Sequence, residues 1–199
     1  MKMLRIMLGV LLFHFAISCS HVNTYWEMTT ERGVTKTYLE TLKKWTRTES
    51  LYSQLETKVH LTVTRKTKSF YDIYLDEYAR IYRLSEEEKK RMAEMEQGLM
   101  AQFDEYFVYA AMPNREANDF DSSKSVWGIF LLSEKEPPLK PVEVRRIEKV
   151  TPLIEQFFPY VNKYYGICYQ LKFPRTIDPE KPVKLLFTSV FGEIALSWP

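Results

Sequence analysis

Alternating apolar and polar positions predict β-strands over most of the chain. Across 57–64, Val59, Leu61 and Val63 alternate with polar residues, which is typical of a strand with one buried and one solvated face. Short apolar runs bounded by turn residues predict further strands at 105–112, 126–132, 142–147, 164–173 and, as a hairpin, within 183–198. The hairpin turns at Gly192, which can adopt a positive φ.

Apolar residues at helical spacing predict two consecutive helices after the first strand. The first begins at Ser69 and places four tyrosines on one face, namely Tyr71, Tyr74, Tyr78 and Tyr82. Ser85 and Glu88 have the spacing of a capping box and start the second helix. Its apolar stripe, expected to face the core, consists of Met92, Met95, Leu99 and Phe103.

These elements predict a mainly β domain with a helical insertion. The six or seven short strands favour an antiparallel β-sandwich, with an immunoglobulin-like sandwich as one form of it. A two-helix insert occupies residues 69–103. A small closed barrel is the alternative architecture.

The first nineteen residues have a different pattern, which is typical of a secretory signal. Lys2 and Arg5 precede an apolar run over 6–17, and small residues lead up to Cys19. The run is shorter than the roughly 20 residues that a permanent transmembrane helix needs.

The sequence Ala16-Ile17-Ser18-Cys19 resembles the lipobox of bacterial lipoproteins. The resemblance implies cleavage before Cys19 and attachment of diacylglycerol to its thiol, so that the lipid is the membrane partner. Ser20 then implies the outer membrane, with the domain on the periplasmic side. The expected organisation is a signal peptide at 1–18, a tether at 19–33 and one globular domain at 34–199. An ordinary cleaved signal and an uncleaved anchor are the alternatives.

The mature chain resembles uncharacterised envelope lipoproteins of such bacteria and no named domain family. Its charges are balanced, because two of the 28 basic residues, Lys2 and Arg5, lie in the signal and leave 26 basic against 26 acidic residues. This balance argues against nucleic acid as a partner. A hydrophobic content of 45% is sufficient for a packed core.

The chain offers few groups for metal binding or cysteine chemistry. Only His21 and His60 follow the signal, and no cysteine pair accompanies them, so no metal and no cofactor are predicted. The acidic loop Glu116, Asp119 and Asp121 lacks the spacing of a calcium loop and is interpreted as solvated or turn-capping. Cys168 lies in an apolar context and is expected to be buried and inert.

No sequence motif indicates catalysis, since no nucleophile elbow and no glycine-rich phosphate loop is present. The four tyrosines of the first helix either pack in the core or form a binding surface for sugar rings or a peptide. The favoured function is therefore a non-catalytic binding or assembly module of the bacterial envelope, with an envelope protein or glycan as partner. The alternatives are a hydrolase using carboxylates of the loop 116–121 and a carrier of a small apolar ligand.

Overall fold

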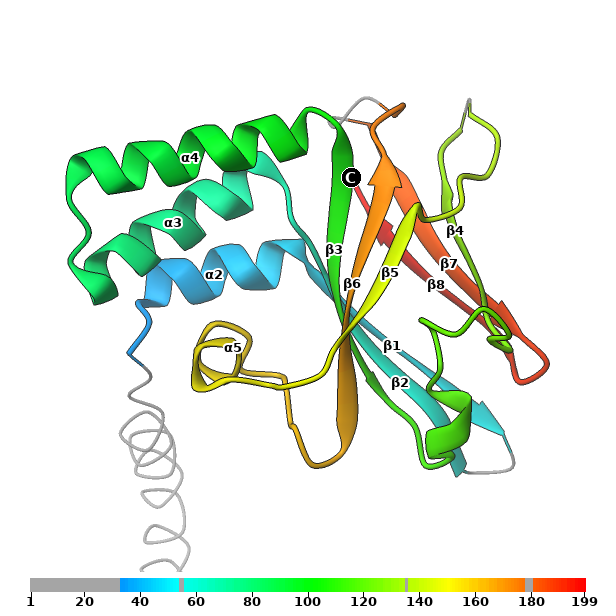
Figure 1. The fold of residues 1–199 in the computed structure, drawn as a ribbon. Helices are drawn as coiled ribbons and strands as arrows, with labels where there is room; N and C mark the ends of the chain where they lie inside the picture. Colours follow the sequence, from blue (N-terminus) through cyan, green and yellow to red (C-terminus); the bar gives the residue numbers. More distant parts are fainter. Residues whose placement is uncertain (1–32, 54–55, 135, 178–180) are drawn as a thin grey trace, which may run out of the picture. The chain divides into compact units, whose positions relative to one another are not determined.

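Two antiparallel β-sheets form a sandwich (Figure 1). The computed structural model describes residues 33–53, 56–134, 136–177 and 181–199. The larger sheet has the order β1-β2-β3-β6-β5 and comprises β1 (Thr46–Ser53), β2 (Glu56–Arg65), β3 (Phe103–Ala111), β6 (Gly166–Pro174) and β5 (Glu143–Ile147). The smaller sheet has the order β4-β7-β8 and comprises β4 (Gly128–Leu132), β7 (Val183–Ser189) and β8 (Gly192–Trp198).

The predicted antiparallel sandwich is confirmed, and its two sheets do not close into a barrel. The division into five and three strands differs from the four and three of an immunoglobulin constant domain. The β7–β8 hairpin turns where expected, with Gly192 at a φ of 130°.

The main hydrophobic core lies between the sheets, where the strand alternation places it. Val59, Leu61 and Val63 of β2 all face inward, with at most 1% of their surface exposed. They meet inward-facing residues of the smaller sheet, among them Leu131, Leu185 and Leu196. Apolar burial of this kind is the main stabilising term of the fold.

Four helices form a third layer on the outer face of the larger sheet (Figure 1). They are α2 (Lys36–Trp45), α3 (Lys68–Tyr82), α4 (Glu86–Met100) and α5 (Pro152–Phe157), and a short 3-10 turn, η1 (Arg115–Ala117), follows β3. The predicted two-helix insert is therefore confirmed as α3 and α4. None of the helices in the described part of the chain is long and apolar enough to cross a membrane.

The two inserted helices begin at side-chain caps. The Oγ of Ser85 accepts a hydrogen bond from the Glu88 amide at 3.3 Å, and the Glu88 carboxylate accepts one from the Ser85 amide at 2.8 Å, which confirms the capping box. Helix α3 begins before the expected Ser69, because the side chain of Thr67 accepts a hydrogen bond from the Phe70 amide.

The apolar stripe predicted for the second helix is wrong for three of its four residues. Phe103 lies beyond the end of α4 and begins β3, and two others are not in the core. Met95 is 73% exposed and Leu99 is 40% exposed. Helix α4 packs on α3 through Met92, Ala93 and Met100, and its remaining apolar side chains extend beyond this contact.

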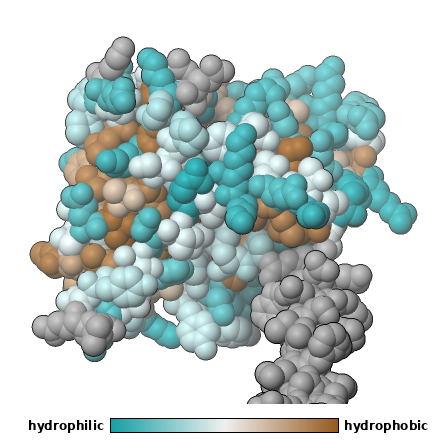
Figure 2. Space-filling model, turned by 180° about the vertical axis from the view of Figure 1, so that it is seen from behind, coloured by the Kyte–Doolittle hydropathy of each residue, from teal (hydrophilic) through white to brown (hydrophobic). Residues whose placement is uncertain are grey.

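The outer face of the smaller sheet carries apolar side chains at the surface. Phe130, Leu132 and Leu186 are each only half-buried there, and apolar patches lie among hydrophilic side chains in the view from behind (Figure 2). The Lys140 ammonium lies 5.9 Å from the centre of the Phe130 ring and shields part of it.

The chain divides after Val34, and Thr35–Pro199 form one unit. The predicted signal, the lipid attachment site at Cys19 and the tether up to residue 32 lie outside the described residues. These assignments stay predictions.

Candidate functional site: an aromatic cleft between helices and sheet

A cleft of about 330 Å³ lies between the helical layer and the larger sheet. Five of its lining residues are aromatic, namely Phe70, Tyr71, Tyr74, Phe107 and Phe158. Rigid rings give a large contact area at a low cost in conformational entropy, and ligand sites commonly combine such walls with a few polar groups.

The rings of the cleft come from segments that are distant in the sequence. Helix α3 contributes Tyr71 and Tyr74, whose rings stack with centroids 6.0 Å apart. Phe107 of β3 points toward the helices because its neighbours Tyr106 and Val108 point into the sandwich. Phe158, just after α5, stacks on Phe107 with ring centroids 4.1 Å apart. The fold of the whole sheet is therefore needed to bring the walls together.

The polar part of the cleft is a paired cluster of charges around Lys66. Its ammonium lies 2.7 Å from a carboxylate oxygen of Glu105 and 3.5 Å from one of Glu96. The side-chain amide of Gln170 donates a second hydrogen bond to Glu105 at 2.8 Å. Only 6% of the Glu105 side chain is exposed. Burial alone would raise the pKa of this carboxyl, but Lys66 and Gln170 hold it below its usual value.

The four tyrosines on the predicted helix face have different environments. Tyr71 and Tyr74 line the cleft, whereas the Tyr78 ring packs 6.3 Å from the ring of Phe157 and Tyr82 is 51% exposed. Burial, helped by the nearby carboxylate of Glu96, raises the pKa of Tyr71 to about 12, so its phenol is a neutral hydrogen-bonding group at physiological pH.

Sequence reasoning missed the rest of the cleft, including Phe107, Phe158 and Lys66, and it missed Glu105, which pairs with Lys66. The aromatic pair lies in segments read only as a strand and a short helix. Lys66 follows the last residue of β2, and Glu105 lies near the start of β3. Only the pairing of these two strands brings them together. The backbone amide of Lys66 donates to the carbonyl of Glu105 at 2.9 Å.

The acidic loop lies on the other face of the larger sheet. The Oδ1 of Asp119 accepts a hydrogen bond from Ser125 Oγ at 2.9 Å. The neighbouring Phe120 packs in the sandwich, with its ring 4.9 Å from that of Tyr169. The fold does not bring Glu116 and Asp121 to the tyrosines of α3. Within the described residues, no group of three histidine, cysteine or acidic side chains is placed to hold a metal ion.

Cys168 is fully buried and has a free thiol, as its apolar context predicts. Burial raises the pKa of this thiol to about 12, which keeps it protonated and unreactive.

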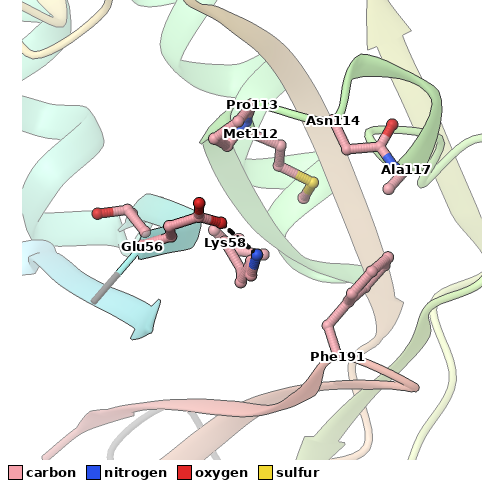
Figure 3. A pocket seen from close by; sticks show the side chains of 9 residues that line it. Glu56, Lys58, Met112, Pro113, Asn114, Ala117 and Phe191 are labelled. Carbon is pink, nitrogen blue, oxygen red and sulfur yellow. Dashed lines mark hydrogen bonds and ion pairs between the residues drawn. The ribbon is translucent and has the colours of Figure 1, made fainter. Parts of the chain in front are cut away.

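An apolar hollow of about 460 Å³ opens at the end of the sandwich (Figure 3). Met112, Ala117 and Phe191 point into it, and Lys58 and Glu56 form an ion pair of 2.6 Å at its rim. A hollow of this kind is what the carrier alternative requires. Its described polar lining residues lie at the rim and form only an exposed ion pair, whereas the half-buried Lys66, Glu96 and Gln170 line the aromatic cleft.

Comparison of the chain with protein-family models, with curated proteins and with solved structures gave no match. The functional argument therefore rests on the residues and their geometry.

Proposed function

We propose that this chain is a lipoprotein of the bacterial envelope whose domain binds an uncharged sugar segment, without catalysis, in the aromatic cleft. The observation that carries the proposal is that one cleft has both aromatic walls and an ion-paired polar side chain, that of Lys66. A sugar ring offers an apolar face that packs against aromatic side chains and hydroxyl groups that need hydrogen-bond partners. The cleft provides both kinds of surface.

The charges at the cleft support an uncharged segment of the ligand at this position. The charged side chains that line the cleft are Lys66 and Glu96, and the Lys66 ammonium is already paired with the carboxylates of Glu96 and Glu105. An anionic group placed there would find no unpaired cation and would be repelled by these carboxylates in a partly buried setting, where repulsion is only weakly screened. Neutral hydroxyl or amide groups avoid that cost and can hydrogen-bond with Gln170 and Glu96.

The ionisation of Glu105 supports binding rather than catalysis. A carboxyl that acts as a general acid near neutral pH needs a raised pKa. The pKa of Glu105 is lowered instead, because Lys66 and Gln170 stabilise its charged form. A carboxylate held in this way accepts hydrogen bonds and orients its neighbours.

The proposed lipid on Cys19 would place this cleft close to a membrane surface. Diacylglycerol has two acyl chains, and two chains are sufficient for stable anchoring. Residues 20–33 form the predicted tether, and a coil of that length spans about 20 Å. The ligand would therefore be a glycan of the envelope itself.

The anchor is tested by the intact mass of protein purified from its native membrane. We expect the mass of residues 19–199 plus diacylglycerol, and we expect a Cys19→Ala variant to lack the lipid. A mass that corresponds to the unmodified chain, or to cleavage elsewhere, would contradict lipidation at Cys19.

The cleft is tested by calorimetric titration with an uncharged tetrasaccharide of N-acetylglucosamine. We expect Tyr71→Ala to weaken binding about tenfold, equivalent to ~1.4 kcal/mol, because it removes one ring from the wall. Tyr82→Ala is the matched control, since Tyr82 lies on the same helix, is exposed and does not line the cleft. Equal losses in both variants, with thermal melting showing both folded, would contradict the assignment of the cleft.

A further inference from the structure

A second hollow, of about 630 Å³, lies at the edge of the larger sheet formed by β5. Its walls come from η1, from β5 with the segment after it, and from the segment that leads into β6. Four of its lining residues are cations, namely Arg115, Arg146, Lys149 and Lys163, and one, Glu148, is an acid. We call this hollow the basic groove.

Three of the four cations of the basic groove have no carboxylate partner among the described residues. Within the described residues, no ion pair involves Arg115, Arg146 or Lys149. Lys163 alone has one, with Glu155 at 3.2 Å. The mature chain has equal numbers of basic and acidic residues, so this excess is a local feature. Concave walls focus the field of like charges and concentrate counter-ions between them.

Two tyrosines in the groove, Tyr164 and Tyr165, are 72% and 75% exposed. Their backbone is fixed by Asn162, whose side-chain oxygen accepts from the Tyr164 amide at 3.0 Å and whose carbonyl accepts from the Tyr165 amide at 3.1 Å. The phenol of Tyr109 donates to the same carbonyl at 3.1 Å. The exposed rings therefore stand on a turn that is bonded to the sheet.

The residue after the two tyrosines is a glycine because the chain passes close to the sheet. A Cβ at Gly166 would lie 2.4 Å from the ring of Tyr109 and 2.7 Å from the carbonyl oxygen of Ala110. This close approach keeps the turn against β3, and it holds the exposed aromatic pair beside the cations. The groove is a preformed surface.

The basic groove and the aromatic cleft meet at β5. Ile147 lines both of them, so one extended ligand can occupy both without leaving the protein surface. The charged residues that line the cleft, Lys66 and Glu96, balance each other, whereas those that line the groove have an excess positive charge. The two hollows therefore suit different parts of one chain.

We infer that the ligand is an acidic glycan, whose uncharged ring occupies the aromatic cleft and whose carboxylate or phosphate groups occupy the basic groove. This rests on the proposed function of the cleft. Guanidinium groups such as those of Arg115 and Arg146 bind the planar or tetrahedral oxygens of such anions through paired hydrogen bonds. The exposed rings of Tyr164 and Tyr165 supply packing surfaces for the intervening sugars. The cations cluster at one hollow and do not follow a long stripe, which favours a glycan over a nucleic acid.

The experiment compares two tetrasaccharides by calorimetric titration. One is the uncharged tetrasaccharide of N-acetylglucosamine, and the other is hyaluronan tetrasaccharide, which carries a carboxylate on alternate sugars. We expect the acidic probe to bind at least tenfold more tightly at low salt and to lose this advantage as salt is raised. We expect Arg115→Gln with Arg146→Gln to remove the advantage and to leave the uncharged probe unaffected. The matched control is Lys184→Gln, an exposed cation on the smaller sheet.

The outcomes separate this inference from the proposed function. If the uncharged probe binds in a manner that depends on Tyr71, and the acidic probe binds no more tightly, the inference is overturned and the cleft stands. If neither probe binds, both are overturned. Binding of a single-stranded DNA oligonucleotide as tightly as the acidic probe, with the same loss in the double arginine variant, would overturn the assignment to a glycan.

Discussion

Replacing Lys66 with methionine is expected to destabilise the domain by about 3–5 kcal/mol at neutral pH, the usual cost of removing one partner from a buried ion pair. Lys66 is the cation that neutralises Glu105, and the exposed fractions of their side chains are 22% and 6%. Methionine keeps most of the side-chain volume but leaves the Glu105 carboxylate in the protein with only the Gln170 amide as a donor. The measurement is chemical unfolding in urea.

The same variant is expected to reverse the dependence of stability on acid. In the native chain the pKa of Glu105 in the folded state is lowered. The ionised carboxylate therefore stabilises the fold at any pH above its unfolded pKa, and this stabilisation is lost as the pH falls through the folded pKa. Without Lys66, burial dominates and raises the folded pKa above the unfolded value. The folded state then binds more protons, and stability rises as the pH is lowered from 7 toward 5.

Two controls make the Lys66 prediction specific. Lys68→Met removes an ion pair with Asp72 in which both side chains are more than half exposed, and it is expected to cost less than 1 kcal/mol. Adding Glu105→Gln to Lys66→Met removes the unpaired charge and is expected to restore part of the lost stability. A loss below 1 kcal/mol for Lys66→Met, or an unchanged dependence on pH, would contradict the account of the charge cluster.

Trp198→Ala is expected to destabilise the domain by about 3–5 kcal/mol, as for other fully buried aromatic residues. Trp198 is the penultimate residue of the chain, yet only 2% of its surface is exposed. Its ring lies edge-on to that of Tyr106 at 5.5 Å between centroids, and its indole N–H donates to the carbonyl of Trp45 at 2.8 Å. It thus connects β8 to the inward face of the larger sheet and to the end of α2.

The Trp198 prediction is checked by unfolding in guanidinium chloride. Trp198→Phe keeps most of the apolar contact and loses the hydrogen bond to Trp45, so an intermediate loss is expected. Tyr164→Ala, at a residue that is 72% exposed, is the control and should change the unfolding free energy by less than 0.5 kcal/mol. A loss below 1 kcal/mol for Trp198→Ala would contradict its role in joining the sheets.

The sequence was sufficient to predict the parts of the fold that depend on local periodicity. Val59, Leu61 and Val63 alternate strictly because one face of β2 is buried between two sheets. The capping box at Ser85 was visible because its two partners are only three residues apart. Strand β1 was not predicted, because it lies at the edge of the sheet and four of its eight residues are exposed, which leaves no clear alternation of apolar and polar positions.

Only one wall of the candidate site could be predicted from the sequence, because only that wall depends on local spacing. A helix face can be read from spacing, and so Tyr71 and Tyr74 were singled out. Their partners Phe107 and Phe158 are separated from them by more than thirty residues, and nothing in a single sequence indicates that these segments meet. The charge cluster depends in the same way on the pairing of β2 with β3. The basic groove could not be predicted, because a balanced total charge does not show where the cations lie in the fold.

The two walls of the cleft have a consequence for the order of events in synthesis. One wall belongs to the helices inserted between β2 and β3, and the other combines Phe107 of β3 with Phe158 after α5, so a nascent chain holds no complete site until most of it has emerged. The larger sheet that carries both walls is complete only when β6 has joined β3 to β5, so the cleft is a late product of folding.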